Sequence, residues 1–273
     1  MKISTQVDLF TNVEPTSVSP AIAKPFVSRS TFYQGDCLVE MNKIADKSID
    51  MILCDLPYGT TACKWDSVIP FDALWKHYER VIKPNGAIVL TASQPFTSAL
   101  VMSNPKMFKY EWIWEKSKAS NFLLAKKQPL KAHENVLVFA NGTPNYYPQK
   151  TQGKPYYRGG VKEKHDNPEV SNNIPNYHSH IRKSEDGMRL PRSVQYFTTA
   201  EFDGKFHPTQ KPIALFEYLV NTYTNEGETV LDNCMGSGTT GVACKKTGRH
   251  FIGIEKDEKY FEIAVSRVSA YCG

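Results

Sequence analysis

The chain has 273 residues, of which 41% are hydrophobic. That length and composition allow one α/β domain with an insertion, or two small domains. No apolar run reaches 18 residues, so the sequence predicts no membrane-spanning helix. The formal net charge is +5, yet residues 106–211 hold 18 Lys and Arg against 10 Asp and Glu, which leaves −3 for the rest of the chain. This basic middle predicts a solvated surface or contact with a polyanion.

The cysteines point to a reducing environment. None of the six forms a C-x-x-C pair, and no Cys/His cluster has zinc-ligand spacing, so the sequence predicts no metal site. Cys37, Cys54 and Cys234 lie in or beside apolar, strand-like runs, as buried free thiols do. Since the N-terminus has no apolar signal-peptide core, we expect a soluble, cytoplasmic protein.

The first third of the chain predicts an arm followed by alternating strands and helices. Residues 1–30 are rich in Ser, Thr, Pro and Val without periodicity, which predicts an extended or poorly ordered arm. The apolar run 48–54 predicts a buried parallel strand, and residues 71–82 have helical spacing. Residues 83–86 (Lys-Pro-Asn-Gly) predict a turn before a second buried strand at 87–90.

The alternation continues and then stops. Residues 94–103 predict a short helix, and residues 110–114 and 135–140 predict two more strands, which completes the βαβ rhythm of a doubly wound sheet. Residues 141–206 are rich in Pro, Gly, Asn, Tyr, Lys and Arg and show no sustained period. Such a length favours a disordered insertion or a functional module with its own irregular fold.

The alternation resumes near the C-terminus. Residues 212–224 predict a helix with Pro212 in its first turn, and residues 229–232 predict a strand. Residues 240–247, 250–255 and 258–271 predict a helix, a strand and a final helix. We expect the two α/β blocks to share one sheet, because neither alone buries both faces of its strands.

A glycine-rich turn joins two of these elements. In residues 230–241 a hydrophobic strand passes through Gly-x-Gly into a helix, where glycines let the backbone approach a ligand and the helix start offers free N–H groups. About twenty residues later a second strand ends at Glu255, a spacing that suits hydrogen bonds to both hydroxyls of a ribose. A tight turn without a ligand remains an alternative, and Gly241 leaves a Gly-x-Gly-x-x-Gly dinucleotide site open by spacing alone.

A second motif follows the strand at 48–54. Asp55-Leu56-Pro57-Tyr58 lies at the carboxyl end of that strand, where open α/β sheets bind ligands. Taken alone, this segment is more typical of an ordinary turn after a strand than of a ligand site. Its interpretation therefore depends on the other motifs of the chain.

Together the motifs resemble those of the beta-class amino-group (N6-adenine or N4-cytosine) DNA methyltransferases. Residues 55–58 resemble the Asp-Pro-Pro-Tyr motif of that family, and residues 230–241 resemble its cofactor loop. Residues 34–38 resemble the segment that contacts the cofactor adenine, and residues 205–212 resemble the motif that precedes the cofactor-loop strand. The order of the motifs, with the catalytic loop before a long basic insertion and the cofactor loop last, is the permuted order of the beta class.

The resemblance implies a fold and a division of the chain. The fold is an α/β, Rossmann-like S-adenosylmethionine-dependent methyltransferase fold with circularly permuted motif order and an inserted target-recognition region. Residues 1–30 would form the arm, 31–140 the catalytic half, 141–206 the target-recognition insertion and 207–273 the cofactor-binding half.

The resemblance also implies a catalytic set, Asp55, Leu56, Pro57 and Tyr58. An exocyclic amine is a poor nucleophile because its lone pair is delocalised into the ring. Asp55 and the Leu56 carbonyl can each accept one N–H, which favours a more tetrahedral nitrogen, and catalysis is then mainly positioning. Pro57 stiffens the loop, and Tyr58 offers a flat face for a base rotated out of the duplex. Leu56 stands where the family has Pro; it keeps the carbonyl and loses stiffness, so we expect activity to survive.

The cofactor residues implied for S-adenosylmethionine come from five places in the chain. Residues 36–37 would lie beside the adenine, and the 232–239 loop would surround the methionine moiety. Glu255 would lie at the ribose, and residues 207–212 would line the other side of the cofactor. The full set is Asp36, Cys37, Asp55, His207, Thr209, Lys211, Pro212, Asp232, Cys234, Gly236, Ser237, Gly238, Thr239 and Glu255. For His207, a helix-capping segment without a ligand remains the alternative.

The insertion and the motif order imply double-stranded DNA as the partner. Residues 141–206 interleave Lys and Arg with Tyr and His, which suits phosphates, guanine edges and exposed bases, although a charged surface loop has the same composition. Asp55 favours N6-adenine, because Ser is more typical there in N4-cytosine enzymes. N4-cytosine methylation, RNA or protein N-methylation and a non-catalytic DNA-binding relative remain alternatives. The family also admits a homodimer and a cognate restriction endonuclease as partners.

Overall fold

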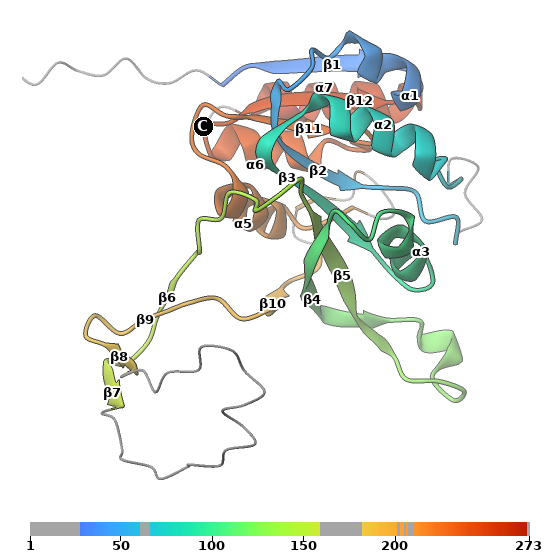
Figure 1. Cartoon of the computed structure of the whole chain (residues 1–273). Helices are drawn as coiled ribbons and strands as arrows, with labels where there is room; N and C mark the ends of the chain where they lie inside the picture. The colour runs from blue at the N-terminus through green and yellow to red at the C-terminus, as the bar shows by residue number, and fades with distance from the viewer. Residues whose placement is uncertain are drawn as a thin grey trace, which may run out of the picture.

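The computed structural model describes residues 28–60, 66–158, 182–200, 203–204, 206 and 210–271. In these residues one large sheet carries helices on both faces (Figure 1). Its strands are β1 (Ser30–Gln34), β2 (Ile49–Asp55), β3 (Ile82–Ala92), β4 (Phe108–Ser120), β5 (Lys131–Phe139), β10 (Val194–Phe197), β11 (Thr229–Asp232) and β12 (His250–Glu255).

The helices lie between these strands in the chain. They are α1 (Cys37–Glu40), α2 (Phe71–Val81), α3 (Phe96–Ser103), α5 (Ile213–Tyr223), α6 (Thr239–Lys246) and α7 (Glu258–Ala270), with 3-10 turns η1 (Met41–Lys43) and η2 (Phe122–Leu124). Four short strands form two small ribbons away from the sheet, namely β6 (Thr151–Gln152) with β9 (Met188–Arg189), and β7 (Tyr156–Arg158) with β8 (Arg182–Ser184).

The strand order joins the two α/β blocks, as expected. The eight strands run β1-β12-β11-β2-β3-β5-β4-β10, so β11 of the C-terminal block pairs in parallel with β2 of the N-terminal block. The carboxyl ends of β2 and β11 therefore meet at the same edge of the sheet. This arrangement confirms the Rossmann-like methyltransferase fold, with the catalytic strand before the cofactor strand in the chain.

Alternate residues of the central strands feed two separate cores. Ile52 and Cys54 of β2 pack on one face with residues of α2 such as Tyr78, whereas Met51 and Leu53 pack on the other face with residues of α5, α6 and α7. Because both faces are covered, β2 is apolar along almost its whole length. Each fully buried aliphatic side chain contributes about 1.5–3 kcal/mol, so this sheet is the rigid frame of the site.

Most expected elements are present within one or two residues of their predicted bounds. The strands predicted at 229–232 and 250–255 match β11 and β12, and the helix predicted at 258–271 is α7. Pro212 is the residue that caps α5 from outside and does not lie in its first turn. The fixed φ of proline suits both positions, so the sequence pattern could not separate them.

The turn predicted at residues 83–86 lies within β3 and does not precede it. Ile82 pairs with Ile49 and Ala87 pairs with Met51, so the four residues bulge out of β3 opposite Asp50. Asn85 takes a left-handed φ of 63°, and a Cβ on Gly86 would meet the Asp50 carbonyl oxygen at 2.9 Å. The turn chemistry was identified correctly, but the neighbouring strand continues the pairing across it.

The βαβ rhythm predicted up to residue 140 is wrong for its last two strands. β4 and β5 pair antiparallel and form a long hairpin closed by the 3-10 turn η2, with no α-helix between them. β5 also runs antiparallel to β3. Periodicity reveals that a strand is buried but not its direction, which is why the hairpin was missed.

Two strands of the large sheet lie where none was predicted. β1 begins at Ser30 and pairs in parallel with β12, while β10 lies within the 141–206 range and pairs in parallel with β4. The arm predicted for residues 1–30 falls outside the described residues except at 28–30. Across the described part of the chain, no helix is long and apolar enough to cross a membrane.

Candidate active site at the carboxyl edge of the sheet

Asp55 ends β2 and is surrounded by polar side chains from neighbouring elements. Thr91 of the neighbouring strand β3 pairs with Asp55, and the Thr91 hydroxyl donates to Asp55 Oδ1. Tyr58 Oη also donates to Asp55 Oδ1 at 2.8 Å and lies 3.1 Å from Thr91 Oγ1. Two side chains, one three residues and one 36 residues away in sequence, thus converge on one carboxylate oxygen.

The second oxygen of Asp55 is held by a lysine from far along the chain. Lys211 Nζ donates to Asp55 Oδ2 at 2.6 Å and lies 3.5 Å from Glu134 Oε2. Lys116 of β4 forms an ion pair with Glu134 Oε1. Two cations therefore alternate with two anions, which lets charged groups remain at a largely buried site. We call Asp55, Tyr58, Thr91, Glu134 and Lys211 the catalytic edge.

The charges of the catalytic edge reinforce one another. Burial favours the neutral amine of Lys211, but Asp55 and Glu134 raise its pKa above the usual value, so it stays an ammonium group. Burial also works against ionised Glu134, but Lys211 and Lys116 hold the pKa of that carboxyl below its usual range. Burial and the nearby Asp55 charge raise the pKa of Tyr58, so it stays a phenol that can donate.

The rest of the catalytic loop is anchored by packing. The Leu56 side chain is 3% exposed and joins the core on the α2 face. The Tyr58 ring stacks on Phe96, with ring centroids 5.1 Å apart and planes at 24°. Asp66 accepts the backbone N–H groups of Gly59 and Thr60. Burial of the leucine side chain thus holds the loop where the family pattern would use a proline ring.

The glycine-rich turn stands on the neighbouring strand. Asp232 ends β11. Its carboxylate accepts a hydrogen bond from the Cys234 N–H at 3.1 Å and another from the Thr240 hydroxyl. Burial raises the pKa of Asp232 from 3.8 to about 7. The Asp232 side chain therefore links the start of the turn, at Cys234, to its end, at Thr240.

Glu255 closes this turn from the next strand. Its two carboxylate oxygens accept the Gly236 N–H at 2.8 Å and the Asp257 N–H at 2.9 Å. Gly238 has a φ of 79°, and a Cβ there would meet Ala264 of α7 at 3.1 Å. That glycine is therefore required by close helix packing as well as by backbone conformation. We call residues 232–241 with Glu255 the cofactor turn.

The segment at residues 34–38 lies beside the cofactor turn. Gln34 pairs with Glu255 at the end of β1, and the Gly35 N–H donates to the Glu255 carbonyl at 2.9 Å. Asp36 caps α1 by accepting the Leu38 N–H and forms an exposed ion pair with Lys256 at 3.1 Å. Cys37 is buried, and its thiol is free. The predicted adenine, ribose and methionine residues thus adjoin one another in space.

Sequence reasoning missed several residues of the site. Thr91 directly follows the buried run 87–90, so a polar residue ending a strand was the available signal. Glu134 precedes the run 135–140, but only an antiparallel strand brings that position to the catalytic edge. Tyr78 of α2 donates to Asn233 Oδ1 at 2.6 Å within the core, a contact across 155 residues that no local pattern encodes.

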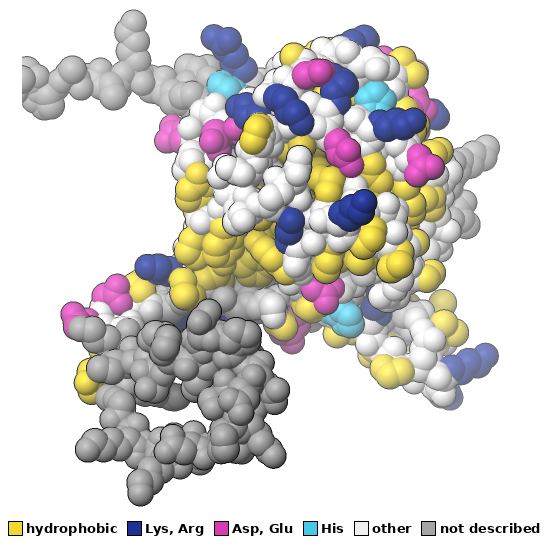
Figure 2. All heavy atoms as spheres, in the orientation of Figure 1, with side chains coloured by type: hydrophobic (Ala, Val, Ile, Leu, Met, Phe, Trp, Pro, Cys, Tyr) yellow, Lys and Arg dark blue, Asp and Glu magenta, His cyan; other side chains and the backbone are white. Residues whose placement is uncertain are grey.

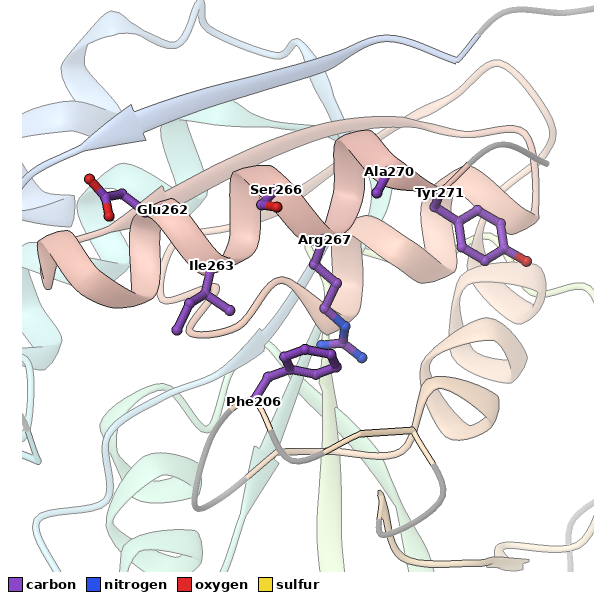
Figure 3. Close-up of a pocket in the computed structure, with 7 residues that line it drawn as sticks. All are labelled: Phe206, Glu262, Ile263, Ser266, Arg267, Ala270 and Tyr271. Atoms are coloured by element: carbon purple, nitrogen blue, oxygen red, sulfur yellow. The ribbon is translucent and has the colours of Figure 1, made fainter.

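The segment at residues 205–212 is described only in part. His207 and Thr209 lie outside the described residues, whereas Pro212 caps α5 and Lys211 reaches the catalytic edge. Phe206 and residues of α7 line a surface hollow of about 610 Å³ (Figure 3). Arg267 in that hollow donates to the Ser237 carbonyl at 3.1 Å, so it braces the cofactor turn from outside.

A Rossmann-like sheet with these two motifs on adjacent strands defines a methyltransferase, and comparisons with known proteins give the family. The DNA methylase family model of N6/N4 methyltransferases matches residues 49–266. That span exceeds half of the chain, so the chain belongs to this family, whose methyl donor is S-adenosylmethionine.

Individual relatives extend this result. The chain is 28% identical over 253 residues to the DNA adenine methyltransferase YhdJ of Escherichia coli strain K12, covering 87% of this chain and 82% of that protein. The M1.HpyAVI–SAM complex has a similar fold, with a TM-score of 0.57, 23% identity and coverage of 87% and 99%. The cytosine-N4-specific PvuII DNA methyltransferase matches with a TM-score of 0.63, 16% identity and coverage of 88% and 86%.

Proposed function

We propose that this protein transfers a methyl group from S-adenosylmethionine to the N6 amino group of adenine in a short duplex DNA sequence, with the base rotated out of the helix. The observation that carries the proposal is the Asp55 carboxylate, which is fixed at the carboxyl end of β2 beside the cofactor turn. Both oxygens of Asp55 receive hydrogen bonds from protein donors. An amino group can replace the Tyr58 hydroxyl at Oδ1 while Lys211 keeps the carboxylate oriented.

The residues of the cofactor turn fit the donor. Glu255 lies at the strand end with its carboxylate facing the backbone N–H of Gly236, and Asp36 lies beside it at the end of β1. A carboxylate suits ribose hydroxyls, and free N–H groups at the start of α6 suit the carboxylate of the methionine moiety. When bound, S-adenosylmethionine supplies an electrophilic methyl group. Asp36, Cys37, Asp232, Cys234, Gly236, Ser237, Gly238, Thr239 and Glu255 are the residues we assign to it.

The protein side of the reaction is positioning and proton acceptance. Asp55 accepts one N–H of the target amine and the Leu56 carbonyl accepts the other, which makes the nitrogen lone pair available. When the methyl group is transferred, the nitrogen becomes positively charged while it still carries both of its protons, and Asp55 Oδ1, which already accepts one of these N–H groups, takes that proton. Lys211, which also lies 3.5 Å from Glu134, holds the Asp55 carboxylate in position.

N4-cytosine methylation is the second candidate, because its exocyclic amine needs the same two acceptors. The likeness to the cytosine-N4-specific PvuII enzyme concerns the fold, whereas the adenine-specific relative from Escherichia coli matches in sequence across 87% of this chain. Asp55 at the first motif position also favours adenine. These two observations support the adenine assignment.

The test is direct. The purified chain is incubated with labelled S-adenosylmethionine and plasmid DNA, and the DNA is digested to nucleosides and separated by mass. We expect label in N6-methyldeoxyadenosine. Label in N4-methyldeoxycytidine would overturn the base assignment, and label only in added RNA would overturn the DNA assignment. We expect S-adenosylmethionine at a hundred times its dissociation constant to raise the free energy of unfolding by about 2.7 kcal/mol. Absence of both methyl transfer and this stabilisation would indicate a relative that does not bind the cofactor.

A further inference from the structure

The β4–β5 hairpin carries an apolar tip with no cover in the described structure. It projects from the sheet on the same side as the small ribbons (Figure 1). Phe122, Leu123 and Leu124 of η2 are 73%, 86% and 39% exposed, and Leu130 is 47% exposed. Exposed apolar residues are ordinary when scattered singly, but four at the end of one projection mark a surface that contacts another molecule.

The flanks of this tip are strongly basic. Residues 116–131 contain five lysines and neither Asp nor Glu. Lys126 and Lys127 directly follow the tip and are exposed. Figure 2 shows this end of the molecule with hydrophobic and Lys/Arg side chains side by side. A basic stem with an apolar end complements a duplex, because phosphates line the outside and bases the inside.

The hairpin is also connected to the catalytic edge. Asp55 pairs with Thr91, Thr91 pairs with Val136 of β5, and Val136 pairs with Trp112 of β4. From Trp112, which lies level with Asp55 across the sheet, β4 continues for eight more residues to Ser120, a length of roughly 25 Å. Grooves of B-DNA are about 8 Å deep, so the tip can reach the base stack. Lys116, at the root, forms an ion pair with the same Glu134 that holds Lys211.

From these observations we propose that the tip of the β4–β5 hairpin, Phe122 to Leu124, enters the DNA beside the target base and fills the space that the base leaves. The basic stem holds the phosphates on either side. The inference rests on the proposed function, because it requires a base that is taken out of the stack. Apolar side chains inserted between base steps are a general means of keeping bases unstacked. The hairpin would thereby lower the barrier to presenting the amino group at Asp55.

The first experiment compares paired and unpaired targets. The probe is a duplex that carries the site mapped from wild-type methylation, made once fully paired and once with an abasic position opposite the target. We expect Phe122→Ser/Leu123→Ser to lower kcat/KM on the paired duplex by about 30-fold, and to act within about threefold of the wild type on the abasic duplex, because that base is already unpaired. Met102→Ser is the matched control, because Met102 is an exposed apolar residue on α3.

Three outcomes would overturn the inference. Equal activity of the double variant and the wild type on the paired duplex would show that the tip does not act on DNA. An equal loss on both duplexes would show a general defect. A change in sedimentation from dimer to monomer, with activity restored at higher protein concentration, would show that the tip covers a second copy of the chain. Absence of methyl transfer by the wild type to any DNA would instead contradict the proposed function.

A second measurement tests the stem independently. Replacing Lys126 and Lys127 by Gln should reduce the slope of log Kd against log salt for the paired duplex by about 2, the number of phosphate contacts removed. The double variant Lys76→Gln/Lys259→Gln removes two exposed lysines from α2 and α7 and should leave the slope unchanged. Equal slopes for the two double variants would contradict a phosphate-binding stem.

Discussion

The catalytic edge and the cofactor turn stand on neighbouring strands of one sheet, β2 and β11, but different interactions hold them. In the cofactor turn, carboxylates of Asp232 and Glu255 accept backbone N–H groups within about twenty residues of sequence. At the catalytic edge, Asp55 is held by the side chains of Tyr58, Thr91 and Lys211, the farthest of them 156 residues away.

The difference matches the two tasks. A turn built on backbone N–H groups can hold a ligand that is the same in every turnover, because its geometry does not depend on distant side chains. In the proposed function the Asp55 carboxylate orients an amine and accepts its proton, and the ion pairs among Lys211, Glu134 and Lys116 hold it in position. The two regions therefore predict different losses when their residues are changed.

The largest effect is expected at Asp55. We expect Asp55→Ala to reduce methyl transfer by at least ~10⁴-fold, because no other acceptor at the catalytic edge replaces its carboxylate. Cofactor binding should persist, measured as a thermal shift on adding S-adenosylmethionine. Asp72→Ala on the exposed side of α2 is the control. If Asp55→Ala abolished binding of S-adenosylmethionine, the catalytic edge and the cofactor turn would not act independently.

A pH measurement tests the carboxyl beneath the cofactor turn. The pKa of Asp232 in the folded chain is about 7, above 3.8, so between about pH 4 and pH 7 the folded chain keeps a proton that the unfolded chain has released. Stability from this group is therefore present at low pH and lost as pH rises through 7, by up to about 4 kcal/mol. Asp232→Asn does not ionise, so its free energy of unfolding should fall less than that of the wild type over this interval. Parallel curves from urea denaturation would show that Asp232 has no raised pKa.

Glu134 tests the charge network without touching the loop. We expect Glu134→Gln to lower kcat about 100-fold with cofactor affinity unchanged, since Lys211 then loses one of its two anions and Asp55 is held less firmly. The residue is a positioning residue, so the pH profile of kcat should shift as well as the maximum. Glu79→Gln on α2 serves as the control. A loss confined to thermal stability, with kcat intact in the folded fraction, would contradict the positioning role.

The smallest effect is expected at Glu255. Glu255→Gln keeps one carbonyl oxygen and replaces the other with a donor, so either Gly236 or Asp257 loses its acceptor. We expect the Kd for S-adenosylmethionine to rise about tenfold, or ~1.4 kcal/mol, with kcat at saturating cofactor unchanged. Titration calorimetry gives the first value and initial rates give the second. An unchanged Kd would remove Glu255 from the ribose site.

Much of the fold and of the cofactor turn could be predicted because their signals are local. The apolar run ending at Asp55 gave β2, and the Gly-x-Gly turn with its terminal acid gave β11, α6 and β12. The bulge at residues 83–86 shows the limit, since turn residues were recognised while the continued pairing of β3 was not.

The sequence by itself determined which strands are buried, where the two motifs lie and in which order they occur. Only the tertiary structure decided that β5 runs antiparallel, that Glu134 therefore lies at the catalytic edge, and that Lys211 pairs with Asp55. The physical reason is that burial and turn formation depend on neighbouring residues, whereas strand direction and long-range ion pairs depend on how the whole sheet packs.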